Sequence, residues 1–331
     1  MGRGGSFMKI VFFGTPDFVL PVLDALHKAF KPRSLESPIA AVVTQRPKPV
    51  GRKQLLEYSP VDTWAHNKKI PIFFDPNDTI KNKIQADIGI LASYRRIIAK
   101  DVIDYFPHGI LNIHFSLLPE LRGAAPIPAT LVMGKKEAGV TIFKLDELLD
   151  HGQIVSQFTE DILPEDTTGT LMVRLFVRAA EVLETLIPAY LQGKITSGEQ
   201  DHSKATFTRE IKKEDALIPP EILNATLQGQ AFKGTWKIPF TKDFEVKPTP
   251  EFVERFIRAM KPWPTAWTYV QLNPKSQSQN PKKLKILKAH LEYSQPTTHN
   301  PQLVIDEVQL EGKNPVIFQQ FKEGYTTATF E

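Results

Sequence analysis

The chain has 331 residues, of which 41% are hydrophobic and 24% charged, and its formal net charge is +4. This length suits two domains, and the composition is that of a globular protein and excludes a disordered or fibrous one. The chain has no cysteine, no His-Glu-x-x-His element and no apolar run of 18 residues, so we expect no disulfide, no bound metal, no membrane contact and a cytoplasmic location.

Short apolar runs alternate with helical stretches through the first part of the chain, after a flexible tail expected at residues 1–8. This alternation predicts βαβ units, and therefore a Rossmann-like α/β domain with a mostly parallel sheet over residues 9–192. No glycine-rich phosphate loop follows the first strand, which argues against nucleotide binding. The expected strands are 9–13, 38–44, 70–73, 88–92, 109–115, 139–145 and 153–158, and the expected helices are 17–29, 60–67 and 167–191.

The sequence becomes polar and loses its period at residues 193–209, which we interpret as a linker. The C-terminal domain, residues 210–331, has a predicted helix at 250–260 and short predicted strands at 267–272, 284–291, 303–309 and 314–321. Such strands suit a small OB-like β-barrel, although propensity alone does not separate a barrel from a sandwich. We interpret residues 217–250 as a surface insertion.

An asparagine and a histidine share one face of the predicted strand 109–115. Alternate side chains of a strand point the same way, which pairs Asn112 with His114. Pro119 ends this strand, and open α/β sheets bind ligands at the carboxyl ends of their strands. Taken alone, Asn-x-His more often marks a hydrogen-bonded core histidine than a catalytic one, and Asp150-x-Gly152 is typical of an ordinary turn. If the three polar side chains meet, their amide, imidazole and carboxylate suit acyl transfer to an amine.

A longer string favours the catalytic interpretation. It resembles the folate-dependent formyltransferases, and within that family the members that formylate methionine esterified to initiator tRNA. The likeness covers residues 9 to about 270. Its elements, in chain order, are Gly-Thr-Pro-Asp-Phe at 14–18, Asn-x-His-x-Ser-Leu-Leu-Pro at 112–119, Arg-Gly-Ala-Ala-Pro at 122–126, Gly-Val-Thr-Ile at 139–142, Asp-x-Gly at 150–152, Glu-Asp-Thr-Thr-Gly-Thr-Leu at 165–171 and the Pro-Trp-Pro stretch at 258–267.

The resemblance implies a monomeric enzyme that takes a formyl group from 10-formyltetrahydrofolate and needs no metal. The acceptor would be the amino group of initiator methionyl-tRNA. Asn112 and His114 would stabilise the negative charge on the formyl oxygen, and Asp150 would assist the amine as a base. The folate-contacting segment of the family matches Ser116, Leu117, Leu118 and Pro119.

One stretch departs from the family pattern near this folate segment. The family has a glycine-containing turn where this chain has Ser93-Tyr94-Arg95-Arg96-Ile97. Its two arginines would either reach the glutamate tail of the folate or be solvated.

Basic residues gather in two stretches although the net charge is small. Residues 255–291 contain eight basic residues and no acidic one, and a second cluster lies in the loop 45–53. Lysines in turns are often only solvated, but the resemblance implies that both stretches hold tRNA. The predicted tRNA-binding residues are Arg46, Lys48, Arg52, Lys53, Lys282, Lys283 and Lys285.

Two other functions stay open at this point. Related enzymes with the same three polar residues formylate amino sugars of nucleotide-linked saccharides. A tRNA-binding homologue that has kept the fold and lost catalysis is the second alternative.

Overall fold

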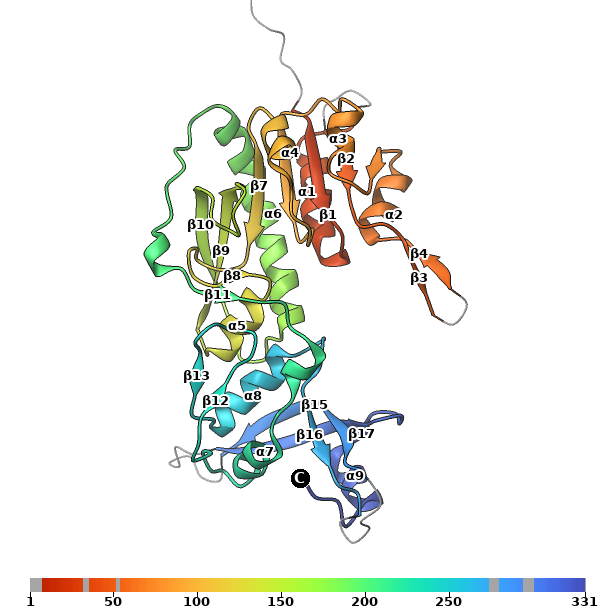
Figure 1. The fold of residues 1–331 in the computed structure, drawn as a ribbon, viewed down its shortest axis with the longest axis vertical. Helices are drawn as coiled ribbons and strands as arrows, with labels where there is room; N and C mark the ends of the chain where they lie inside the picture. Colours follow the sequence, from red (N-terminus) through yellow and green to blue (C-terminus); the bar gives the residue numbers. More distant parts are fainter. Residues whose placement is uncertain (1–7, 32–35, 52–53, 274–279, 294–300, 331) are drawn as a thin grey trace, which may run out of the picture. The chain divides into compact units, whose positions relative to one another are not determined.

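The computed structural model describes residues 8–31, 36–51, 54–273, 280–293 and 301–330 (Figure 1). The chain divides into two compact units. The first holds residues up to Arg122 with Ala138–Glu160 and Met172–Ala205, and the second holds the remainder. The predicted domain boundaries, the linker 193–209 and the insertion 217–250 stay predictions. The predicted tail lies almost entirely outside the described residues.

A seven-stranded sheet forms the first unit, in the order β10-β9-β7-β6-β1-β2-β5. β1 is parallel to β2 and β6, β6 is parallel to β7, and β2 is parallel to β5, whereas β9 is antiparallel to β7. The predicted mostly parallel sheet is therefore confirmed. The strands are β1 (Ile10–Gly14), β2 (Ile39–Val43), β5 (Ile72–Phe73), β6 (Ile88–Ala92), β7 (Ile110–His114), β9 (Glu137–Lys144) and β10 (Ile154–Asp161).

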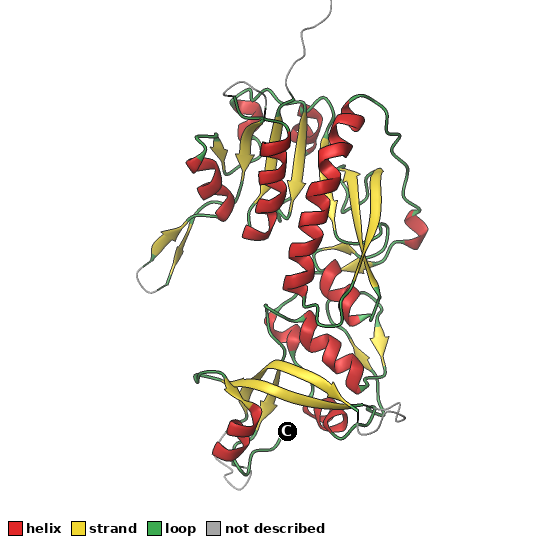
Figure 2. Cartoon of the chain, turned by 180° about the vertical axis from the view of Figure 1, so that it is seen from behind, coloured by secondary structure: helices red, strands yellow, loops and turns green. Residues whose placement is uncertain are grey.

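Helices cover the sheet because its central strands are buried along their whole length. Every residue of β1, β6 and β7 is buried. Phe176 of the long helix α6 stacks on Phe18 at 5.5 Å between ring centroids and meets the edge of Phe115 at 4.5 Å, which fixes α6 against the end of β7 (Figure 2). Helix α6 spans Thr168–Leu191. The remaining elements of this unit are η1 (Asp17–Val19), α1 (Leu20–Ala29), β3 (Lys48–Val50), β4 (Leu55–Glu57), α2 (Pro60–Asn67), α3 (Asp78–Lys81), α4 (Lys100–Tyr105) and η2 (His202–Lys204).

The second unit combines helix α8 (Pro250–Ala259) with a four-stranded antiparallel sheet in the order β14-β15-β16-β17. The Thr249 side chain caps α8 by accepting a hydrogen bond from the Phe252 N–H at 3.3 Å. This confirms the predicted helix and the β-rich character of the C-terminal domain. The other elements are α5 (Pro126–Val132), β11 (Phe207–Thr208), η3 (Lys213–Ala216), α7 (Pro220–Leu227), β12 (Trp236–Lys237), β13 (Glu245–Val246), β14 (Trp267–Val270), β15 (Lys282–Glu292), β16 (Gln302–Leu310), β17 (Val316–Ile317) and α9 (Phe318–Gly324), with β8 (Arg122–Gly123) at the junction of the units.

One predicted strand is wrong in most of its length. Residues 314–321 were expected to be extended, but only Val316–Ile317 form a strand and a helix begins at Phe318. Phe318 and Phe321 are three residues apart and therefore lie on one face of a helix, where their rings stack at 6.0 Å. Burial of Phe321 decides the local structure against the β propensity of the segment.

Candidate active site

Strand β7 presents Asn112 and His114 at its carboxyl end. Asn112 lies between Leu91 of β6 and Phe143 of β9, and His114 is paired with Thr141 of β9. The two residues are only 8% and 6% exposed. The alternation of the strand therefore places an amide and an imidazole on one face, as predicted, in surroundings with little access to water.

Each ring nitrogen of His114 faces an oxygen atom of another residue. Nε2 lies 3.0 Å from the carbonyl oxygen of Leu121, and a carbonyl oxygen only accepts, so Nε2 carries a hydrogen. Nδ1 faces the Asp150 carboxylate, with 3.7 Å between Nδ1 and Oδ2. The only N–H of a neutral His114 is thus already donated to Leu121. His114 can donate to a substrate only after Nδ1 has taken up a proton, which refines the expected oxyanion role.

Asp150 lies in the loop between β9 and β10. Its φ of 45° is in the left-handed region, which is uncommon for a residue other than glycine, and its side chain is 12% exposed. Two residues later the chain passes so close to β9 that a Cβ at Gly152 would lie 1.8 Å from the carbonyl oxygen of Lys144. This explains the glycine of the Asp-x-Gly element. Of the predicted catalytic residues, the structure brings His114 and Asp150 to within 3.7 Å of each other.

The predicted folate-contacting segment, Ser116 to Pro119, has its backbone tied to the two strands beside it. Thr141 Oγ1 donates to the carbonyl of Ser116 at 2.6 Å and accepts from the N–H of Leu118 at 3.1 Å. Gln157 Nε2 donates to the Leu118 carbonyl and to Thr141 Oγ1, both at 2.9 Å. The segment is therefore held by its main chain, while the Leu117 side chain is exposed.

The structure also explains why the Gly-Val-Thr-Ile element begins with a glycine, Gly139. A Cβ at this position would lie 2.4 Å from the backbone nitrogen of Leu117. Only glycine allows β9 to approach the folate-contacting segment this closely.

The turn after β6 contains the two arginines that depart from the family pattern. Ser93 has a φ of 50° and Arg95 a φ of 61°, so both lie in the left-handed region, where a glycine would be unstrained. Arg95 and Arg96 are exposed. Tyr94, which precedes the two arginines, is buried, and burial raises the pKa of Tyr94 to about 12.

The first predicted tRNA-binding cluster lies at the β3–β4 hairpin, which projects from the first unit (Figure 1). Arg46 and Lys48 are exposed there, next to exposed apolar side chains such as Leu55 and Leu56. Arg52 and Lys53 lie outside the described residues. The sequence analysis treated this segment as a loop, because strands with every side chain exposed carry no apolar alternation.

The second predicted cluster lies on β15 of the second unit. Lys282, Lys283 and Lys285 are exposed. Lys283 Nζ lies 4.4 Å above the centre of the Trp267 ring, and in the β14–β15 ladder Lys283 is opposite Tyr269. Cations beside aromatic rings suit a nucleic-acid strand, because the cations bind its phosphates and the rings stack on its bases.

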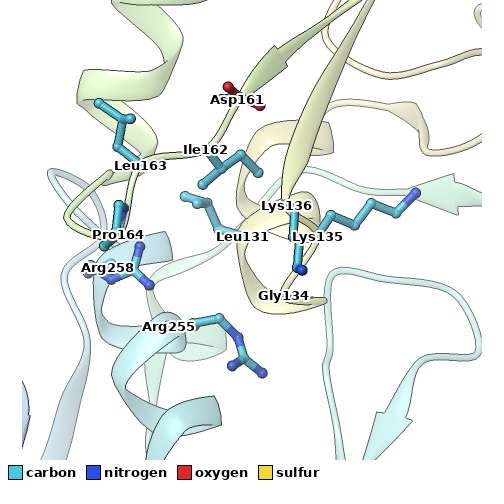
Figure 3. Close-up of a pocket in the computed structure, with 10 residues that line it drawn as sticks. All are labelled: Leu131, Gly134, Lys135, Lys136, Asp161, Ile162, Leu163, Pro164, Arg255 and Arg258. Carbon is cyan, nitrogen blue, oxygen red and sulfur yellow. The ribbon is translucent and has the colours of Figure 1, made fainter.

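A cavity of about 440 Å³ in the second unit is lined by none of the predicted site residues (Figure 3). Arg255 and Arg258 of α8 stand on one side of it and Lys135 and Lys136 on the other. Nowhere in the described part of the chain do three or more His, Cys, Asp or Glu residues form a group that suits a metal ion. Within the same residues, no helix is long and apolar enough to cross a membrane.

Three residues that hold this site could not be assigned a role from the sequence. Thr141 was visible as part of the Gly-Val-Thr-Ile element, but without a role. Gln157 and Gln200 lie in segments with no motif, so only the contacts in the folded chain identify them; Gln200 donates to the carbonyl oxygens of Asp150 and Gly152.

Comparisons with known proteins agree with this geometry. Residues 8–187 match the family "Formyl transferase" and residues 245–326 match "Formyl transferase, C-terminal domain". The methionyl-tRNA formyltransferase of Listeria monocytogenes is 35% identical over 272 residues, which cover 80% of this chain and 77% of that protein.

Two solved structures share the fold along almost the whole chain. One is the methionyl-tRNA formyltransferase from Clostridium thermocellum, with a TM-score of 0.53, 16% identity and coverage of 92% of this chain and 98% of that one. The other is the N-formyltransferase from Helicobacter canadensis in complex with folinic acid and dTDP-3-aminofucose, with a TM-score of 0.59, 15% identity and coverage of 94% and 98%. At these identities the two likenesses show the fold and not the substrate.

Proposed function

The chain belongs to the formyl transferase family, and on that premise we propose that it moves the formyl group of 10-formyltetrahydrofolate to the amino group of initiator methionyl-tRNA. The product is N-formylmethionyl-tRNA, which serves translation initiation. The observation that carries the proposal is the 35% identity with a methionyl-tRNA formyltransferase along 80% of the chain. The paired His114 and Asp150 at the end of β7 supply chemistry that fits this reaction.

The reaction exchanges one C–N bond for another. The neutral amine attacks the formyl carbon, the oxygen gains negative charge, and the bond from carbon to N10 of the folate then breaks. One proton leaves the amine and one is added to N10. Because α-amino groups have a pKa of about 8 in model compounds, the amine needs only modest help from a base near neutral pH.

We assign the proton transfers to His114 and Asp150 and the stabilisation of the oxygen to Asn112. Asp150 accepts the proton of the attacking amine, and Nδ1 of His114, when protonated, donates to the leaving nitrogen. Oδ2 and Nδ1 are 3.7 Å apart, and a closer approach of the two groups to hydrogen-bond distance returns the proton from one to the other between turnovers. Asn112, on the same face of β7, donates its amide N–H to the developing oxyanion. Nε2 of His114 stays bound to the Leu121 carbonyl and keeps the ring oriented.

Substrate binding follows from the two kinds of surface described above. We propose that the backbone of Ser116, Leu117, Leu118 and Pro119, held by Thr141, contacts the folate. The tRNA backbone binds the exposed Arg46 and Lys48 at the hairpin, together with Arg52 and Lys53, which lie outside the described residues, and the exposed Lys282, Lys283 and Lys285 of β15. On this proposal the enzyme is a cytoplasmic monomer that works without a metal.

The decisive experiment offers the purified protein two acceptors beside 10-formyltetrahydrofolate. One is initiator methionyl-tRNA and the other is dTDP-3-aminofucose, with product detection by mass spectrometry. We expect formylation of the tRNA-bound methionine alone, and a loss of kcat on the order of 10² to 10³ in His114→Gln and Asp150→Asn. Formylation of the sugar alone would identify an amino-sugar formyltransferase. Binding of tRNA without any product would identify an inactive homologue, and either outcome would overturn the proposal.

A further inference from the structure

Gln200 links the Asp150 loop to a buried arginine. The residue is 5% exposed and lies after helix α6 in the chain. Its Nε2 donates to the carbonyl oxygen of Asp150 at 3.0 Å and to that of Gly152 at 2.8 Å. Its Oε1 accepts from Arg122 Nη2 at 2.6 Å and from Nε at 3.2 Å. Both donors and both acceptor positions of the carboxamide are therefore used, which fixes its orientation.

Arg122 is itself held from a second side. Its Nη2 lies 2.8 Å from Nδ1 of His202, and because arginine only donates, this nitrogen accepts. The ring of His202 stacks on that of His151 at 3.9 Å and an angle of 8°, and His151 Nδ1 lies 2.7 Å from Oδ2 of Asp146. Burial lowers the pKa of Arg122, while the carboxylates of Asp150 and Asp146 act in the opposite direction. A buried cation thus faces the loop that carries Asp150.

Backbone hydrogen bonds just before Gln200 in the chain fix how its segment is aligned with the Asp150 loop. Ile154 and Gly198 exchange two backbone hydrogen bonds, each 2.8 Å long. Ser197 Oγ donates to the side chain of Gln153 at 2.8 Å. Gln200 therefore meets the loop at a defined position, where it contacts the main chain on both sides of His151.

A fixed main chain matters here because Asp150 is strained. A residue with a side chain in the left-handed region costs roughly 1 to 2 kcal/mol, so its conformation persists only where the surroundings hold it. The φ of Asp150 decides where its carboxylate points, and therefore whether Oδ2 reaches Nδ1 of His114. The hydrogen bond from Gln200 to the Asp150 carbonyl holds the peptide group that follows Asp150, and the bond to the Gly152 carbonyl holds the chain two residues further on.

We propose that Gln200, oriented by Arg122, is a positioning residue for formyl transfer, which directs the Asp150 carboxylate at His114 by holding the main chain at Asp150 and Gly152. The catalytic half of this inference rests on the proposed function. A misplacement of about 1 Å in a reacting group lowers the rate on the order of 10²-fold. We take this as the largest fall in kcat to expect when Gln200 is lost.

A purely structural role predicts something different. In that case Gln200 would serve only as the partner of the buried Arg122 guanidinium. Gln200→Glu separates the two roles, since a carboxylate still accepts from Arg122 and adds an ion pair, but it cannot donate to the carbonyl oxygens of Asp150 and Gly152. Gln200→Met removes both sets of hydrogen bonds at nearly the same size. Gln85→Met is the control, because it makes the same substitution at a glutamine of the same unit whose carboxamide donates to the Lys83 carbonyl at 3.4 Å, outside the Asp150 loop and the Gln200 segment.

The three variants are compared with the wild type by steady-state kinetics with methionyl-tRNA and by hydrogen–deuterium exchange of residues 146–153. We expect Gln200→Glu and Gln200→Met to lower kcat by about 10 to 10² with little change in the KM of either substrate, and to speed exchange in the loop. Gln85→Met should keep the wild-type kcat. If Gln200→Met does not fold, Gln200→Glu alone decides, because it preserves the contact with Arg122.

Two results would overturn the inference. Wild-type kcat in Gln200→Glu would show that Gln200 serves Arg122 alone, and unchanged exchange in both Gln200 variants would show that it does not hold the loop. Failure of the proposed function is recognised separately, because then the wild type itself forms no N-formylmethionyl-tRNA. The exchange of residues 146–153 in Gln200→Glu would in that case still support or refute the hold on the loop.

Discussion

Replacing Thr141 by valine removes one hydroxyl from the centre of the folate-contacting segment and leaves the shape of the side chain almost unchanged. The hydroxyl donates to Ser116 and accepts from Leu118 and Gln157. Since Thr141 is fully buried, the N–H of Leu118 would lose its partner away from water, at a cost of about 1 to 3 kcal/mol. We therefore expect the free energy of unfolding to fall by about 2 kcal/mol in urea titrations.

The same change should weaken donor binding. If about 1 kcal/mol of the loss is felt in the backbone that we propose contacts the folate, the KM for 10-formyltetrahydrofolate should rise roughly fivefold, while the KM for methionyl-tRNA stays constant. Thr79→Val is the control, because Thr79 is equally buried but its hydroxyl donates only to the nearby Pro76 carbonyl at 2.7 Å. A wild-type unfolding free energy in Thr141→Val, or an equal rise in the KM for the donor in both variants, would refute the reasoning.

Three further predictions concern the turn after β6 and the basic face of β15. Tyr94→Phe should raise the free energy of unfolding by about 1 kcal/mol at neutral pH, because the buried hydroxyl has no partner among the residues that the structure describes. Because burial raises the pKa of Tyr94 to about 12, the phenolate is disfavoured in the folded state, so the free energy of unfolding should fall as the pH rises above the unfolded-state pKa of about 10 towards 12; urea titrations should show that fall in the wild type and not in the variant. Arg95→Gln should raise the KM for a triglutamate form of the formyl donor and not for the monoglutamate form, and equal effects on both forms would exclude contact with the glutamate tail. Lys283→Gln and Lys285→Gln should each reduce the slope of log K against log salt for tRNA binding by about 1, and an unchanged slope would remove that lysine from the interface.

The fold could be predicted from the sequence where burial follows a simple period. β1, β6 and β7 are short apolar runs that are buried on both faces, and the alternation within β7 also paired Asn112 with His114. The β3–β4 hairpin and α9 were missed because their structure depends on more than apolar period: the hairpin strands are exposed on both faces. Helix α9 forms where β propensity is high but two aromatic rings gain a common face.

The candidate site could be predicted only in part, for a related reason. Asp150 follows from no local rule, since Asp-x-Gly is ordinary turn chemistry, and its importance came from a resemblance in the longer string. Gln200 is separated by 50 residues from Asp150 and by 78 from Arg122, and it lies in a polar segment without a period. A contact of this kind leaves no pattern in a single sequence, because it depends on how one carboxamide is oriented in the folded chain.

The orientation of His114 depends on two strained residues that are stabilised in different ways. Leu121, with a φ of 55°, presents its carbonyl oxygen to Nε2, and Asp150, with a φ of 45°, presents its carboxylate to Nδ1. Each left-handed residue costs roughly 1 to 2 kcal/mol. Burial of the Leu121 side chain offsets this cost on one side of the ring, and the hydrogen bonds of Gln200 offset it on the other. The nitrogen that must keep its proton is therefore set by packing in the core. In the proposed mechanism Nδ1 exchanges protons, and it faces a carboxylate on a loop that the hydrogen bonds of Gln200 hold, so we expect small shifts of the Asp150 loop to alter the proton transfer and leave the orientation of the ring unchanged.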